Sequence, residues 1–308
     1  MRITFAETLA ELATIDRRIV LLTADLGFEA LDAFVSRHPD RFFNVGVAEQ
    51  NMIGLATGLA EAGFIPFVYS IVPFAIFRAY EFIRNGPVQH RLPVRIVGVG
   101  AGFEYGSNGF SHYGLDDLAM TRVHNDLTVL APADFQQTRS IFLATWSRPG
   151  PIYYRLGKDE RTSVPGLEGR FTWDAPELVR EGSSVLLVTT SSISAEAAIV
   201  AQNLDMRGIS TALVVAAQIN PFPREAIATL VNRFRLVATI ENHFPSGGLG
   251  SAVAEVIAER GTGSRLIRLG ATGEFDGRSG STEFMHEMFG LSGAHMTEAI
   301  ATAWAGMT

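Results

Sequence analysis

The 308-residue sequence predicts an α/β protein with two doubly wound domains, a first one built on a mostly parallel sheet and a smaller second one. Two observations support this prediction. Short runs rich in Val, Ile and Leu alternate with helical stretches along the chain, which is typical of a parallel sheet covered by helices on both faces. Between 157 and 183 this alternation lapses into charged residues, glycine and proline. We therefore expect a first domain over 1–165, a linker over 166–183 and a second domain over 184–308.

The individual elements follow from hydrophobic periodicity. In the first domain we expect a helix at about 5–15, strands at 18–25 and 42–47, a small-residue helix at 51–60, a short strand at 67–69, an apolar helix at about 74–84, and strands at 93–100, 128–131 and 152–156. In the second domain we expect strands at 184–190, 211–216, 236–241 and 265–269, helices at 195–206, 224–233 and 250–259, and a closing helix at 294–305.

Composition argues against several classes of function. The net charge is −7, from 25 basic and 32 acidic residues without a basic block, so we expect no nucleic-acid partner. The absence of cysteine excludes a thiol nucleophile and a cysteine-bound metal. The N-terminus lacks the plan of a secretory signal, and no apolar run reaches the roughly 18 residues of a membrane helix. We expect a cytoplasmic protein without membrane contact.

Glu49 is the first candidate catalytic residue. It lies where the strand FFNVGV meets the following helix, the edge of the sheet at which α/β proteins usually bind ligands. Its neighbours Val47, Ala48 and Met52 would bury the carboxylate, raise its pKa and let it exchange a proton. A helix-start glutamate that stabilises the helix macrodipole fits the same position equally well. The residues alone leave both interpretations open.

A glycine-rich loop at 98–114 is the second candidate region. Its six glycines in 17 residues suit a loop whose backbone approaches a ligand closely. His112 lies near the end of this loop, where an imidazole could exchange protons or bind a substrate oxygen near neutral pH. The alternative is a histidine that only holds the loop together. Ser111 is a poor nucleophile candidate, because the loop lacks the sharp turn of a nucleophile elbow.

Two further features suggest ligand contacts. Phe74 and Phe77 are spaced for one face of a helix, which indicates either core packing or an apolar wall for a heteroaromatic ring. Arg155 ends an apolar strand, where a guanidinium could bind a phosphate or pair with a surface acid. The glycines at 247–250 fit a dinucleotide fingerprint only weakly, and no Walker, zinc or EF-hand spacing is present. We expect no metal ligand in this chain.

The order of these motifs resembles the C-terminal half of the transketolase family. The matching segments are VGVAEQNM, PFAIFRAYEFIR, GSNGFSHYG, PIYYRLGK and ENHFPSGGLGSAVAE. They correspond to the pyrimidine-binding domain, over 1–165, followed by the small C-terminal domain, over 184–308. The chain resembles the C-terminal subunit of a split transketolase. The β subunits of 2-oxo acid dehydrogenases and 1-deoxyxylulose-5-phosphate synthase share this arrangement.

The resemblance implies residues that bind thiamine diphosphate. Glu49 matches the glutamate that hydrogen-bonds N1′ of the aminopyrimidine and shuttles a proton there. Phe74 and Phe77 match aromatic residues that stack on the pyrimidine. Asp25, at the end of the first strand, matches an aspartate near the cofactor.

The resemblance also implies residues that bind the substrate. His112 matches a catalytic histidine on the substrate side, and Arg155 matches an arginine that binds the sugar phosphate. Two positions depart from the sugar-using members: Gly100 replaces a histidine, and Asn108 replaces an aspartate that contacts a sugar hydroxyl. Losing a polar partner costs about 1–3 kcal/mol, so these departures suggest a different ketose or acceptor.

A partner subunit follows from what the sequence lacks. In the family, a Gly-Asp-Gly…Asn segment of the N-terminal half holds the diphosphate and Mg²⁺ (or Ca²⁺), and this sequence has no such segment. We expect an N-terminal transketolase subunit as partner, in an α2β2 assembly. The implied activity, in carbohydrate metabolism, is transfer of a two-carbon ketol unit from a ketose phosphate to an aldose. The alternatives are a β subunit that decarboxylates a 2-oxo acid or forms an acyloin, and a non-catalytic module that kept the fold.

Overall fold

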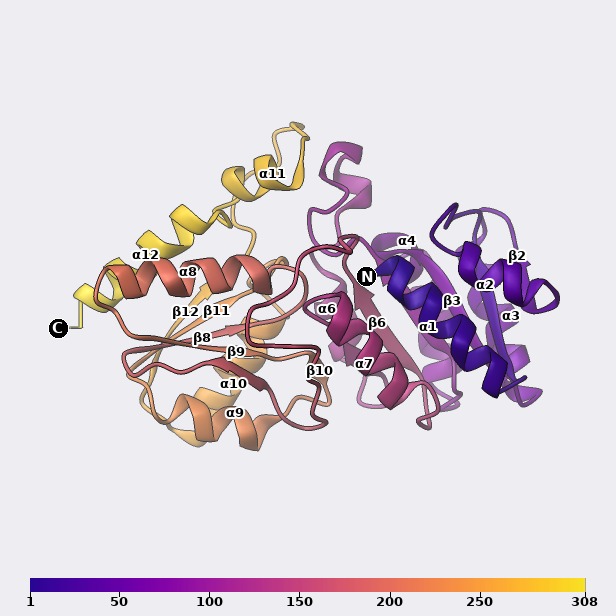
Figure 1. The fold of residues 1–308 in the computed structure, drawn as a ribbon, viewed down its shortest axis with the longest axis horizontal. Helices are drawn as coiled ribbons and strands as arrows, with labels where there is room; N and C mark the ends of the chain where they lie inside the picture. Colours follow the sequence, from indigo (N-terminus) through magenta and orange to yellow (C-terminus); the bar gives the residue numbers. More distant parts are fainter. Residues whose placement is uncertain (308) are drawn as a thin grey trace.

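Two sheets organise the chain, which the structure, a computed structural model, describes over residues 1–307 (Figure 1). The first sheet has the strand order β10-β5-β6-β4-β3-β1-β2. Its strands are β1 (Ile19–Thr23), β2 (Phe42–Asn44), β3 (Ile65–Ile71), β4 (Arg95–Val99), β5 (Thr128–Leu130), β6 (Ile152–Leu156) and β10 (Gln218–Asn220). All neighbours are parallel except β10 and β5.

The second sheet is smaller, with the order β12-β11-β8-β9-β7. Its strands are β7 (Glu177–Arg180), β8 (Val185–Thr189), β9 (Thr211–Val215), β11 (Leu236–Ile240) and β12 (Arg265–Leu269). Only the β7–β9 pair is antiparallel. Helices cover both faces of this sheet, with α8 and α12 on one side and α9 and α10 on the other (Figure 1). The predicted class, two mostly parallel α/β domains, is confirmed.

The expected helices are present, except that the one at 74–84 is broken, and the structure adds helices in both domains that were not expected, at Asp32–Arg37, Asp117–Arg122, Phe135–Thr145 and Thr282–Met288. The helices are α1 (Arg2–Ile15), α2 (Asp32–Arg37), α3 (Glu49–Glu61), α4 (Val72–Ile76), α5 (Tyr80–Ile83), α6 (Asp117–Arg122), α7 (Phe135–Thr145), α8 (Ser194–Met206), α9 (Arg224–Val231), α10 (Leu249–Arg260), α11 (Thr282–Met288) and α12 (Gly293–Ala305). The helix expected at 74–84 is broken into α4, α5 and a π-helical turn at Arg84–Val88. Pro87 lies inside that turn and cannot donate the backbone bond of a regular helix.

Two strands cross the expected domain limits. β7 lies in the stretch expected to be a linker, 166–183, so the expectation of an irregular connection there is wrong for its second half. β7 is an edge strand that is only partly buried. Because its two ends, Glu177 and Arg180, are charged, its sequence lacks the apolar run by which a strand is predicted. β10, from the second half of the chain, pairs with β5 at the edge of the first sheet.

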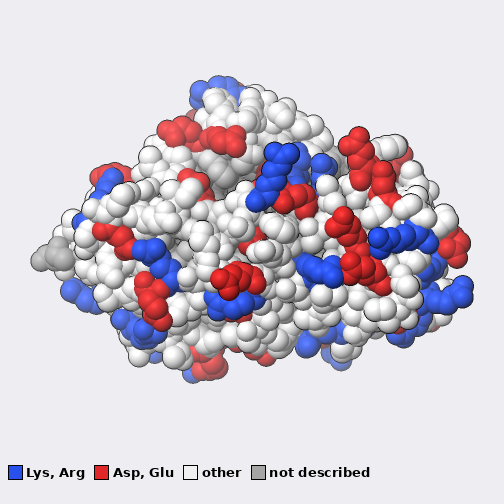
Figure 2. Space-filling view, in the orientation of Figure 1, with Lys and Arg blue, Asp and Glu red and all other residues white. Residues whose placement is uncertain are grey.

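The surface carries both signs of charge. On the face shown in Figure 2, Lys and Arg are interspersed with Asp and Glu, and no large area of a single sign is visible. Among the described residues, no helix is both long and apolar enough to cross a membrane.

Candidate active site

The carboxyl edge of the first sheet gathers four of the candidate residues. Asp25 follows β1, Glu49 follows β2, Phe74 follows β3, and His112 lies in the loop after β4. β1 and β3 are neighbours in the sheet. From β1 the chain passes to β2 on one side, whereas from β3 it passes to β4 on the other side. The strand order therefore reverses between β1 and β3, and such a switch point is where open α/β sheets bind ligands.

Glu49 begins α3, and its side chain is only 4% exposed. Its burial was predicted, and its place in the first turn of the helix also fits the macrodipole interpretation. Its partner was not predicted: Nη1 of Arg78 donates to Oε1 at 3.0 Å and to Oε2 at 3.3 Å. Arg78 lies between α4 and α5, and its own side chain is 48% exposed. The buried carboxylate is thus neutralised by a cation that reaches in from the surface.

The ring of Phe74 completes this cluster. The guanidinium of Arg78 lies over it, with Cζ 4.0 Å from the ring centroid. The imidazole of His112 meets the same ring edge-on, at 5.0 Å between centroids and 68° between planes. Burial, and next the charge of Arg78, lower the pKa of His112 below its ordinary value. Its imidazole is therefore neutral near pH 7 and able to accept a proton. The structure brings Glu49, Phe74 and His112 together through Arg78.

Tyr105 explains the glycine at position 100. Gly100 has φ +82°, and a Cβ there would lie 2.2 Å from the ring of Tyr105. The Tyr105 ring lies 6.2 Å from that of His112, and Nζ of Lys158 lies 4.1 Å from its centroid. An aromatic side chain with a cation above it therefore fills the space where the family's additional histidine would project.

The other predicted residues have different partners. Asp25 accepts a hydrogen bond from Nδ2 of Asn44 at 3.1 Å, at the end of β1. Asn108 is exposed, and its only described side-chain contact is Ser107, at 3.5 Å. Phe77 packs on a different hydrophobic cluster from Phe74 and lines a separate small cavity, so the two rings do not form one wall.

The prediction for Arg155 is wrong in this structure. Its side chain has no exposed surface, and Nε donates to Oδ2 of Asp117 at 2.8 Å. Nη2 donates to Oδ1 of Asp117 at 3.1 Å and to the carbonyls of Gly114 and Asn242 at 2.7 and 3.0 Å. A guanidinium enclosed in this way cannot reach a substrate phosphate. Hydropathy could not reveal this, because the neutralising carboxylate lies 38 residues earlier in the chain.

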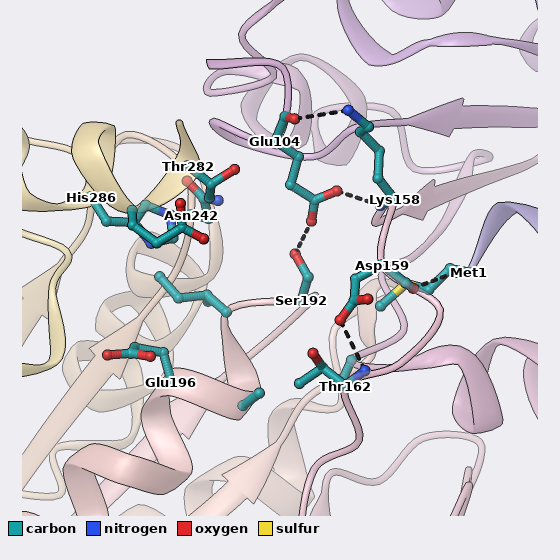
Figure 3. Close-up of a pocket in the computed structure, with 14 residues that line it drawn as sticks. Met1, Glu104, Lys158, Asp159, Thr162, Ser192, Glu196, Asn242, Thr282 and His286 are labelled. Carbon is teal, nitrogen blue, oxygen red and sulfur yellow. Dashed lines mark hydrogen bonds between the residues drawn. The ribbon is translucent and has the colours of Figure 1, made fainter. Parts of the chain in front are cut away.

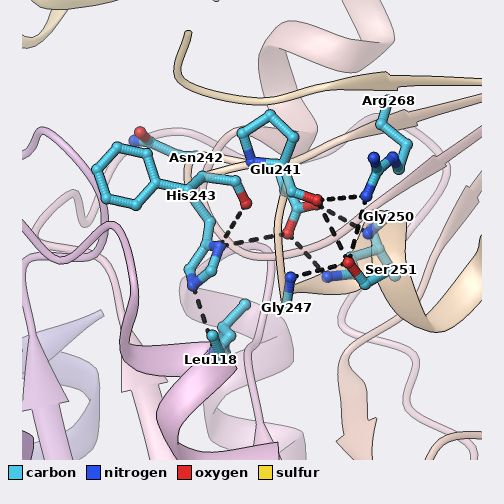
Figure 4. Close-up of polar contacts among 12 residues, drawn as sticks. Leu118, Glu241, Asn242, His243, Gly247, Gly250, Ser251 and Arg268 are labelled. Carbon is cyan, nitrogen blue, oxygen red and sulfur yellow. Dashed lines mark hydrogen bonds and ion pairs between the residues drawn. The ribbon is translucent and has the colours of Figure 1, made fainter.

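The glycines at 247–250 have a structural role (Figure 4). The carboxylate of Glu241 accepts hydrogen bonds from the N–H groups of Leu249 and Gly250, at 2.7 and 2.8 Å, and so occupies the N-terminus of α10. A Cβ at Gly248 would lie 2.0 Å from Oε2 of Glu241. Burial raises the pKa of Glu241 to about 7 and lowers that of the neighbouring His243 to about 4. A side chain thus takes the place that a dinucleotide phosphate would need.

A polar cavity of about 460 Å³ lies where the two halves of the chain meet. Figure 3 shows Glu104 and Lys158 on one side of it, and Asn242 and His286 on the other. Glu104 is half-buried, its burial raises its pKa, and it accepts hydrogen bonds from the backbone N–H of Lys158 and from Oγ of Ser192. Since Ser192 follows β8, this carboxylate joins the two sheets beside the candidate site.

Comparisons with known proteins agree with this geometry. The family model "Transketolase, pyrimidine binding domain" matches residues 1–162, and "Transketolase, C-terminal domain" matches 175–296. A putative transketolase C-terminal section from Methanocaldococcus jannaschii is 36% identical, with 97% of this chain and 95% of that protein covered. A 6-deoxy-6-sulfo-D-fructose transketolase subunit from Clostridium sp. is 34% identical, with 97% and 92% covered. A solved structure described as "Split gene transketolase, inactive beta4 tetramer" has a TM-score of 0.88 at 34% identity, covering 99% of this chain and 98% of that one.

Proposed function

Because the chain belongs to the transketolase family and corresponds to the C-terminal subunit of a split member, we propose that it acts with an N-terminal subunit as a thiamine-diphosphate-dependent ketol transferase. The two-carbon unit would pass from a ketose phosphate, or a similar anionic ketose, to an aldose acceptor. The sulfofructose named for one relative supports an anionic sugar. We assign the diphosphate and its Mg²⁺ or Ca²⁺ to the partner, in an α2β2 assembly.

One observation supports the cofactor assignment most directly. The guanidinium of Arg78, a planar cation, donates to Glu49 while it stacks on Phe74. The carboxylate and the aromatic face can therefore both be reached by one flat group with an N–H donor at its edge. The aminopyrimidine of thiamine diphosphate is a group of this shape and polarity, so the residues present fit it.

Each residue then has a defined task. The cofactor supplies the electron sink, and the protein supplies position and electrostatics. Glu49 would hold or move a proton at the pyrimidine nitrogen, and Phe74 would fix the plane of the ring. His112, neutral near pH 7, would exchange a proton with a substrate oxygen. Asp25 lies nearby at the end of β1. With Arg155 buried, Arg78 and Lys158 are two cations that lie close to this edge.

The test is Glu49→Gln in the complex reconstituted with the N-terminal subunit. Losing a proton-transfer group should lower the rate of ketol transfer by about 10²–10⁴-fold. Glu61→Gln, at the exposed end of the same helix, is the matched control and should keep the normal rate. Ketol transfer by the Glu49→Gln complex at a near-normal rate would refute the mechanism.

A further inference from the structure

Arg78 makes the same two contacts that the proposed function assigns to the cofactor. It donates to both carboxylate oxygens of Glu49, at 3.0 and 3.3 Å. Its Cζ lies 4.0 Å from the centroid of the Phe74 ring. A guanidinium is flat, cationic and rich in N–H donors, so it satisfies a carboxylate and an aromatic face together. The aminopyrimidine and Arg78 cannot both occupy this position.

We propose that Arg78 is a positioning residue that occupies the aminopyrimidine position in the cofactor-free chain and is displaced when the cofactor binds. This inference rests on the proposed function of Glu49 and Phe74. In the free chain, the ion pair keeps Glu49, a 4% exposed carboxylate, from lying buried without a partner. The bound ring would take over that partnership, and the arginine would move away.

The surroundings of Arg78 allow this movement. Its side chain is 48% exposed, and within residues 1–307 Glu49 is its only hydrogen-bond partner. The pocket that it lines with residues 47–51 has a volume of about 470 Å³. Arg155 is the opposite case, because it is fully buried and bonded to Asp117 and two backbone carbonyls. Arg78 can therefore leave its place without disturbing the core.

Competition of this kind weakens the apparent affinity for the cofactor. A site that is free only part of the time binds with its intrinsic affinity reduced by that fraction. The ion pair is open to solvent on the arginine side, and the cation–π contact is made to a partly buried ring. Each contact is modest, so together they should weaken binding by about three- to tenfold. Removing the guanidinium should therefore raise the affinity for the cofactor by the same factor.

The experiment measures the dissociation constant of thiamine diphosphate by calorimetry, with Mg²⁺ and the reconstituted complex. We expect Arg78→Ala to tighten binding by about three- to tenfold. Arg84→Ala is the control, because Arg84 is an exposed arginine whose guanidinium, in the part of the chain that the structure describes, donates only to Asn85, and it should leave the constant unchanged. An unchanged or weaker affinity in Arg78→Ala would overturn the proposal.

Two further measurements separate this proposal from the function on which it rests. The Nε resonance of Arg78, followed by NMR in the complex, should shift on addition of cofactor, and an unmoved resonance contradicts displacement. Glu49→Gln tests the function itself. If that variant loses ketol transfer while Arg78→Ala binds the cofactor as the wild type does, only the role of Arg78 fails. If Glu49→Gln keeps both activity and affinity, the cofactor site itself is misassigned.

Discussion

Arg155 is a buried cation whose charge is balanced by the carboxylate of Asp117, both with no exposed side-chain surface. Replacing it by methionine leaves that carboxylate without its partner, which should lower the free energy of unfolding by about 3–5 kcal/mol. Urea denaturation of the purified chain measures this. Arg18→Met breaks a surface pair with Asp16 and should leave the free energy of unfolding nearly unchanged. If the Arg155→Met variant were as stable as the wild type and had a raised KM for the phosphorylated donor, this would instead support a role of Arg155 in binding the substrate phosphate.

The ionisation of Glu241 and that of His243 change the free energy of unfolding with pH in opposite directions. The folded-state pKa of Glu241, about 7, lies above its ordinary 4.5, so its contribution to stability is full at low pH and is lost as pH rises towards 7. The folded-state pKa of His243, about 4, lies below its ordinary 6.5, so its contribution is lost as pH falls towards 4. Between pH 4.5 and 6.5 the two slopes therefore oppose each other.

Glu241→Gln removes one of the two opposing contributions, so the pH dependence that comes from His243 should become visible. Relative to the wild type, the unfolding free energy of the variant should rise with pH across this window, by up to about 1.4 kcal/mol per pH unit. Denaturant titrations at several pH values between these limits measure the slope. Glu61→Gln, at an exposed position, should keep the wild-type slope. Parallel curves for Glu241→Gln and wild type would contradict the raised pKa of Glu241.

The residues found from sequence are those whose role depends on local context. Glu49, Phe74 and His112 each follow a strand end, and the structure places them together at one edge of the sheet. Arg78 lay inside a recognised motif, but its contact with Glu49 depends on how two separate elements pack, 29 residues apart. Arg155 was misjudged for the same reason. A charged residue in an apolar strand is a signal of burial with a distant partner as much as of a ligand.

At the scale of elements, two glycines predict opposite effects of the same substitution. Gly248→Ala places a Cβ 2.0 Å from the Glu241 carboxylate, so it should lower the melting temperature and weaken the start of α10. Gly58→Ala, inside α3, meets no atom within 4 Å and should stabilise the helix by about 0.5–1 kcal/mol. Thermal unfolding of the two single variants tests this contrast, and equal effects would contradict it.

Most elements with an apolar run could be predicted, including the partly exposed edge strand β12, whereas β7 and α7 could not. β6 and β12 agree with their expected limits at both ends, and β8 lies within its expected run. β7 was not predicted because it is a half-buried edge strand. α7 was not predicted because its helical face is only weakly apolar. Asp134 was a usable signal for α7, since its side chain accepts from the N–H of Gln137 at 2.8 Å as a helix N-cap.

At the scale of the whole molecule, the two halves form one cooperative structure around the candidate site. β10 extends the first sheet, Ser192 bonds Glu104, and the carbonyl of Asn242 accepts from Arg155. Sequence periodicity could separate the two sheets, but it could not show that β10 joins the first sheet or that buried polar groups link the two halves, because these contacts join residues far apart in the chain. In the proposed function this edge is half of a cofactor site, with groups for a flat ring and none assigned to its diphosphate.

The measurement that tests this account most directly is a calorimetric titration of thiamine diphosphate and Mg²⁺ into the chain alone and into its complex with the N-terminal subunit. We expect no tight binding by the chain alone and saturable binding by the complex, because we assign the diphosphate and metal ligands to the partner. A nanomolar dissociation constant for the chain alone would contradict the account.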